Sequence, residues 1–89
     1  MLRFTLADAS TGAPVVDLEP FLGAAGHMLV ANADLTEAGH AHPEEQASRG
    51  PSVYFQPRMP AGGLYKLWVQ FQWKGQVITV PFVVSVREP

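Results

Sequence analysis

The sequence predicts an all-β fold: a two-sheet antiparallel sandwich, immunoglobulin-like, with about seven strands. Apolar and polar residues alternate with a period of two along much of the chain, which is the period of a half-buried strand. Eight glycines and eight prolines interrupt the 89 residues too often for long helices. Hydrophobic residues make up 47% of the chain and charged residues 16%, a balance typical of a folded domain with a core.

The first two thirds of the chain hold five short predicted strands, each bounded by turn-forming residues. The first strand alternates apolar and polar residues and stops at the turn-forming run 8–12. Residues 20–26, with a proline and two glycines, are predicted to form a loop. A hairpin follows, and Pro43 ends its second strand because proline cannot donate to a ladder. The five strands are predicted over residues 2–6, 15–18, 27–31, 38–42 and 53–56.

The last third of the chain predicts a long β-hairpin. Residues 65–73 and 78–86 each alternate, and Lys74-Gly75 between them suits a tight turn. Trp68 is out of phase with the apolar residues of the first arm, so it is predicted on the other face of the sheet, as a packing contact, a partner surface or a shield over a metal. Pro81 lies inside the second arm and predicts a sheet edge, a bulge or a strand switch there.

Composition excludes several classes of function. Six basic and eight acidic residues give a net charge of −2, and the basic residues are scattered, which argues against nucleic acid and anionic membranes as partners. No stretch approaches the roughly 20 apolar residues of a membrane helix, so this chain is not expected to insert into a membrane. Cysteine is absent, which excludes disulfides, thiolate metal sites and cysteine nucleophiles.

The three histidines, His27, His40 and His42, are the residues whose spacing points to chemistry. His40 and His42 are two apart on a predicted strand, so they project from one face with about 6.6–6.8 Å between their Cα atoms. In the predicted hairpin, pairing residue 31 with 38 puts His27 opposite His42, and pairing 29 with 38 puts it opposite His40. Both registers collect three imidazoles on one face, whereas a slip of one residue would separate them.

Three imidazoles without a thiolate favour a borderline metal, copper or zinc, over calcium or magnesium. Met28 and Met59 are candidate thioether ligands that would shift the preference toward Cu(I), although both also fit a place in the core. Oxygen ligands near the histidines are limited to loop carboxylates that also suit a solvated surface. These carboxylates are Asp34, Glu44 and Glu45.

Several strings of the sequence together resemble a family of small bacterial exported β-sandwich domains. The strings are residues 17–27 (DLEPFLGAAGH), residues 40–43 (HAHP), and residues 63–71 (GLYKLWVQF) with the Gly50-Pro51 pair before them. The family pattern reads approximately L-E-P-Y-L-G-A-x-G-H, then H-x-H-P, then F-P-x-x-G-x-Y-K-L-W-x-Q-F. Phe21 stands where tyrosine is common, and Met59 where an aromatic residue is common.

The resemblance implies a β-sandwich in a periplasmic or extracellular location, and it places His27, His40 and His42 on the family's three histidines. Some members are associated with the handling of heavy metals and copper. Because the chain opens directly into a predicted strand and not into a signal peptide, we expect residues 1–89 to be a single module excised from a longer exported protein.

The leading hypothesis is a non-catalytic copper- or zinc-binding module of the bacterial cell envelope. The alternative is a structural or protein-interaction sandwich without metal, which presents a sheet edge or Trp68 to a partner such as another envelope protein. Three histidines with an open coordination position also describe a catalytic zinc site. Glu44 is the only general base near them, however, and a small sandwich has little concavity, so we expect no enzyme.

Overall fold

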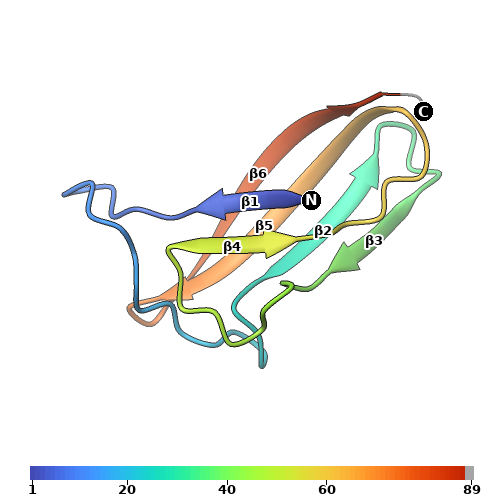
Figure 1. Ribbon diagram of the computed structural model, residues 1–89. Coiled ribbons are helices and arrows are strands. Elements are labelled where there is room, and N and C mark those ends of the chain that lie inside the picture. The colour runs from blue at the N-terminus through green and yellow to red at the C-terminus, as the bar shows by residue number, and fades with distance from the viewer. Residues whose placement is uncertain (88–89) are drawn as a thin grey trace.

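The computed structural model, which describes residues 1–87, consists of six strands in two antiparallel sheets that pack against each other (Figure 1). The predicted all-β sandwich is confirmed. The larger sheet has the strand order β3-β2-β5-β6, and the smaller sheet pairs β1 with β4. Among the described residues, no helix is long and apolar enough to cross a membrane. The strands are β1 (Leu2–Thr5), β2 (His27–Asn32), β3 (Ala38–Ala41), β4 (Ser52–Phe55), β5 (Gly63–Trp73) and β6 (Gln76–Val86).

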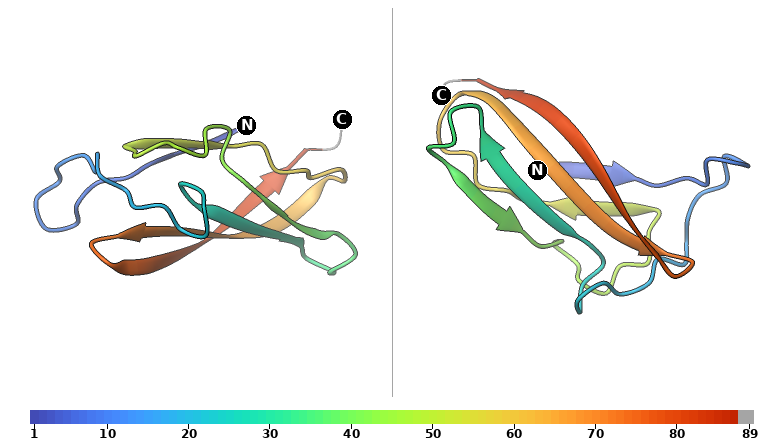
Figure 2. Two further views of the ribbon diagram at one scale, coloured as in Figure 1. Left: turned by 90° about the horizontal axis from the view of Figure 1, so that it is seen from below. Right: turned by 180° about the vertical axis from the view of Figure 1, so that it is seen from behind.

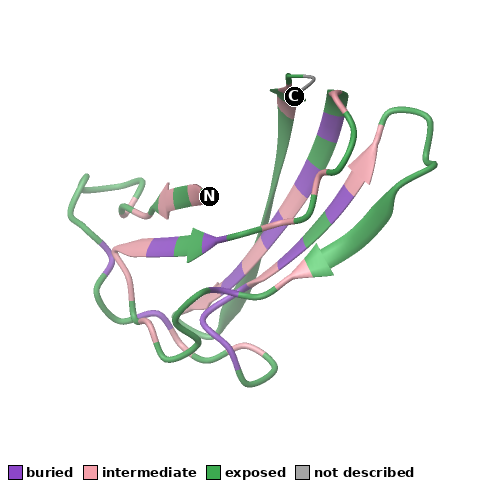
Figure 3. Cartoon of the chain, turned by 45° about the vertical axis from the view of Figure 1, so that its right-hand side comes forward, coloured by how far each residue is buried: buried purple, intermediate pink, exposed green. Residues whose placement is uncertain are grey.

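The core lies between the two sheets and is built from alternate residues of each strand (Figure 3). Strand β5 contributes its odd-numbered residues, and its even-numbered residues face the outer side. Trp68 is therefore on the outer face, as its phase predicted. The buried core residues are Val15, Leu18, Ala25, Met28, Val30, Val53, Phe55, Tyr65, Leu67, Val69 and Phe71.

The two predicted hairpins of the larger sheet are present. Ala31 pairs with Ala38, which is the first of the two registers considered above, and β2 then pairs with β5 on its other side. Strands β5 and β6 are joined by Lys74 and Gly75, both at positive φ, and pair along eleven positions. Strand β6 is the last strand of its sheet, which confirms the edge position predicted from its proline.

The predicted strand at residues 15–18 is absent, and the sandwich has six strands instead of about seven. Val15 and Leu18 are both buried although they are three apart, a spacing that does not fit the alternation of a strand. Flanking prolines also remove backbone donors at positions 14 and 20. Its backbone bridges are isolated, Ala7 with Pro14 and Glu19 with Gln72, and do not extend into a ladder.

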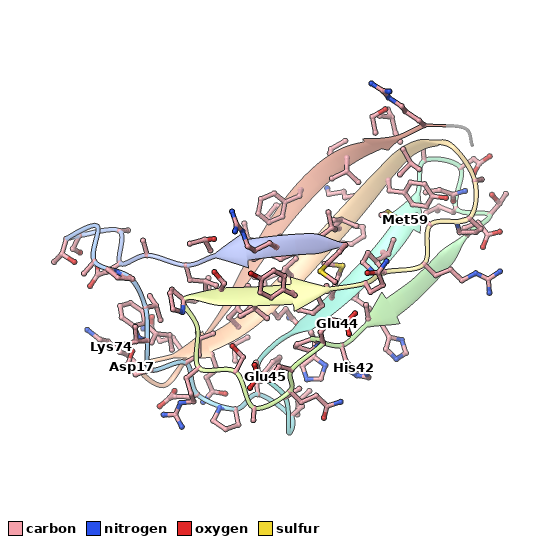
Figure 4. All side chains as sticks on the ribbon, viewed as in Figure 1. Asp17, His42, Glu44, Glu45, Met59 and Lys74 are labelled. Carbon is pink, nitrogen blue, oxygen red and sulfur yellow. The ribbon has the colours of Figure 1, made fainter. Side chains whose placement is uncertain are left out.

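The segment from Asp17 to Gly26 is fixed to the turn of the long hairpin by two carboxylates. Asp17 Oδ1 accepts a hydrogen bond from Trp73 Nε1 at 2.8 Å. Glu19 Oε1 accepts one from the Gly75 amide at 2.8 Å and one from the Gln72 side chain at 3.3 Å. The stick view shows Asp17 and Lys74 together at this end of the molecule (Figure 4). These bonds hold the loop that leads directly into β2.

Gly26, the last residue of this loop, lies against β5 where no side chain fits. A Cβ at this position would stand 2.9 Å from the Gln70 carbonyl oxygen and 2.9 Å from the Phe71 ring. We expect Gly26→Ala to lower the free energy of unfolding by about 1–3 kcal/mol, because backbone and ring must move apart. Gly39→Ala is the matched control, since a Cβ there would meet no atom within 4 Å. Urea denaturation of both variants makes the comparison, and equal stabilities would contradict this account of the packing.

Candidate metal centre

The three histidines gather at one end of the β2–β3 hairpin, on the outer face of the larger sheet. His27 begins β2, His40 lies in β3, and His42 is the first residue after β3. Because Met28 pairs with Ala41, His27 stands opposite His42. The ring centroids of His27 and His42 are 5.3 Å apart, and those of His40 and His42 are 5.5 Å apart. His42 therefore lies between the other two rings.

His27 is the only one of the three that is partly buried, and its ring is held in place by Phe21. Its Nε2 lies 2.7 Å from the Phe21 carbonyl oxygen, and the two rings meet edge to face with centroids 5.3 Å apart. A carbonyl oxygen can only accept, so Nε2 carries the proton in this bond. Nδ1 of the neutral ring is then left with a free lone pair.

A tight turn at Phe21–Ala24 presents that carbonyl. The two residues exchange backbone hydrogen bonds, with Phe21 N to Ala24 O at 2.8 Å and Ala24 N to Phe21 O at 3.2 Å. The two residues between them, Leu22 and Gly23, have φ of 52° and 85°. Positive φ at both central positions is the signature of a type I′ turn, which explains a glycine at the second of them. The buried Ala24 and Ala25 then anchor the loop below His27.

The spacing of the rings fits a common ion. With metal–nitrogen bonds of about 2.0–2.1 Å in a tetrahedral site, the centres of two ligating imidazoles stand roughly 5 Å apart. Both observed separations, 5.3 Å and 5.5 Å, lie close to this value. Within residues 1–87, however, no three histidine, aspartate or glutamate side chains already converge as a set of metal ligands. The rings must turn to share an ion, and the exposed side chains of His40 and His42 have room to do so.

The sequence-predicted additional ligands lie in different places. Met28 is fully buried in the core, on the face of β2 opposite His27, and Met59 packs against the same core. Asp34 is in the turn at the other end of the hairpin. This turn lies beyond the far end of β2, which is about 17 Å from His27 at 3.3–3.4 Å per residue. Glu44 and Glu45 follow His42 in the loop toward β4 and are exposed, and Figure 4 shows both near His42.

Trp68 lies on the same outer face, with one strand between it and His40. Leu29 pairs with His40 on one side and with Trp68 on the other, so one whole strand separates the two rings. At about 4.8 Å between neighbouring strands, this separation is roughly 10 Å. The Trp68 ring instead carries the ammonium of Lys66 at 5.2 Å from its centroid. His27, in contrast, is the diagonal neighbour of Trp68 across the β2–β5 pair.

Phe21 is the member of this centre that sequence reasoning missed. The sequence predicts residues 20–26 only as a loop. The available signal was the placement of a turn-forming glycine between an aromatic residue and His27. The acceptor, however, is a backbone carbonyl, and any residue type could supply one.

One protein family has a model that matches residues 1–88, and its description is Domain of unknown function (DUF8832). No curated protein and no solved structure shows significant similarity to the chain.

The carbonyl of Phe21 dictates which nitrogen of His27 is protonated. We expect neutral His27 to be the Nε2–H tautomer, because only that form can donate to the oxygen 2.7 Å away. Long-range ¹H–¹⁵N correlation spectra recorded at alkaline pH identify the tautomer, with the exposed His40 and His42 as internal comparisons. A predominant Nδ1–H form of His27 would show that this hydrogen bond is not made in solution.

Proposed function

Because the chain belongs to the DUF8832 family, which has no assigned function, we propose a function from its histidine centre: the protein is a non-catalytic metal-binding module that holds a copper or zinc ion with His27, His40 and His42. The observation that carries this proposal is the common outer face of the three imidazoles, with ring centres 5.3 Å and 5.5 Å apart. The rings of His40 and His42 are exposed, and an ion shared with His27 would stabilise the cluster.

The hydrogen bond of His27 supports ligation through a defined atom. Metal-ligating histidines almost always donate their other ring N–H to a carbonyl, a carboxylate or water, which fixes the tautomer and makes the ligating nitrogen more basic. Phe21 supplies this carbonyl, so Nδ1 of His27 would be the ligating atom. His40 in β3 and His42 just after it would complete the site. A fourth position would be open to water or to a carboxylate of the adjacent loop.

The ligand set favours Zn(II) or Cu(II) over Cu(I). Imidazole nitrogen suits both divalent ions, and Cu(I) prefers thiolates and thioethers. The chain has no cysteine, and Met28 is buried on the other face of its strand.

The centre also fits binding better than catalysis. The cavity of about 450 Å³ that reaches His40 is lined by neither His27 nor His42.

A place in the bacterial cell envelope, periplasmic or extracellular, is the part of the proposal that rests on the resemblance of the histidine strings alone. Delivery, storage and sensing of the ion are all compatible with three imidazoles on an exposed face.

Calorimetric titration with Zn(II) and Cu(II) tests the proposal. We expect one site with a dissociation constant of about 1 μM or tighter. His27→Ala, His40→Ala and His42→Ala should each weaken binding at least roughly tenfold, because each removes one ligand. Gln70→Ala is the matched control, since Gln70 pairs with His27 on the same face of the sheet but offers no imidazole. Absence of a micromolar site, or binding that survives His42→Ala unchanged, would refute the proposal.

Acidification should release the metal, because protons compete with the ion for imidazole nitrogen. An ordinary imidazole titrates near pH 6.5, so affinity should be constant at higher pH and fall progressively below about pH 6.5. Occupancy measured after equilibrium dialysis at a series of pH values follows this loss. Full occupancy at about pH 4, where imidazoles are protonated and carboxylates still hold ions, would assign the site to carboxylate oxygens instead.

A further inference from the structure

The core-facing side of strand β6 is incompletely covered. Ile78, Val80 and Phe82 pair with buried residues of β5, so they face the core as their partners do. The β5 partners are at most 4% exposed, whereas the three β6 residues are 39%, 36% and 40% exposed. A sheet of two strands packs against a sheet of four, and it leaves the last strand of the larger sheet partly open.

A cavity of about 360 Å³ lies at this opening, and the three β6 residues line it. Val15, Leu18 and Phe71 also line it and are at most 4% exposed, so the cavity reaches the core. Ala7 and Ala9, from the loop after β1, complete the lining with methyl side chains that leave the space open. Ligand sites in proteins are concave, mostly apolar and of about 300–1,000 Å³, and this cavity falls within that description.

The free edge of β6 does not suit an added strand. Pro81 lies in the middle of β6 and pairs with Trp68, and proline has no N–H to donate to a strand on its other side. In Figures 1 and 2 the end of β1 and the loop after it lie on the free side of β6. Both features favour a small molecule over a partner strand as the occupant of the opening.

The lining favours an uncharged molecule. Within the part of the chain that the structure describes, no charged side chain lines the cavity. Trp73 lines it, but its indole N–H is already donated to Asp17 Oδ1 at 2.8 Å. An ion that left water for this cavity would therefore lose its hydration and gain no partner of opposite charge.

The rings that line the cavity favour an aromatic molecule. Four aromatic residues contribute to the lining, and Phe4 and Phe82 among them meet with ring centroids 5.3 Å apart. Aromatic rings pack well against one another in edge-to-face or offset arrangements. Since an apolar cavity of about 150 Å³ holds benzene, about 360 Å³ has room for roughly two rings. We propose that this cavity binds a small, uncharged aromatic molecule of about two rings.

A methyl NMR titration with indole, an uncharged molecule of two fused rings, tests the proposal. Ile78 is the only isoleucine of the chain, so its δ1 methyl signal reports on the cavity directly. We expect this signal to shift and to saturate at one indole per chain, with a dissociation constant on the order of 100 μM. Indolecarboxylate, the same rings with a negative charge, should bind at least roughly tenfold more weakly.

Two variants fill the cavity from different sides. Val80→Phe should weaken indole binding at least roughly tenfold, because the larger side chain takes up the space of the ligand. Val77→Phe is the matched control, since Val77 lies in the same strand and is 48% exposed but faces the outer side of the sheet. Ala9→Phe fills the cavity from the exposed loop after β1, and it replaces Val80→Phe in the comparison if that variant does not fold.

An Ile78 methyl signal that shows no saturable shift up to about 5 mM indole would overturn the proposal. So would indolecarboxylate that binds as tightly as indole, or a loss of binding in Val77→Phe equal to that in the variants that fill the cavity. The titration is made in EDTA, so its outcome does not depend on the histidine centre. Failure of this test leaves the metal-binding proposal standing, and failure of the metal titrations leaves this one standing.

Discussion

The pairing register of β2 is the constraint on which both the core and the histidine centre depend. Met28 faces the core, so its neighbour His27 faces outward, and pairing Ala31 with Ala38 puts His40 and His42 on that same outer face. A slip of one residue would move Met28 to the surface and bury His27 without a charge partner. The apolar burial of the strand, worth roughly 25 cal/mol per Å², therefore also holds the histidines on one face.

The loop before β2 links that register to the rest of the fold. Its first half is bound to the β5–β6 turn through Asp17 and Glu19, and its last residue, Gly26, fits only because it has no side chain. The turn at Phe21 lies between these fixed points and presents a carbonyl to His27. The same contacts that fold the loop thus orient the imidazole and select its free nitrogen.

The sequence predicts most of this arrangement where a period of two decides the outcome. Alternation along residues 65–86 is enough to place the long hairpin, the outward Trp68 and the edge at Pro81, and the two-residue spacing of His40 and His42 sets their common face. Alternation does not predict the conformation of residues 15–18. Their burial comes from contacts with both sheets and follows no regular period. Alternation also does not identify the Phe21 carbonyl as an acceptor, because every residue has a carbonyl. Nor does alternation reveal that β6 stays uncovered, since a covered strand would read the same.

We propose that one ion joins His27 to His40 of β3 and to His42, the residue after it. Anomalous diffraction from a crystal grown with zinc tests it most directly. The account predicts a single site with about 2.0–2.1 Å from the ion to His27 Nδ1 and to one nitrogen each of His40 and His42. The bond from His27 Nε2 to the Phe21 carbonyl should persist in that structure. An ion bound elsewhere, or one that His27 reaches only by giving up Phe21, would contradict it.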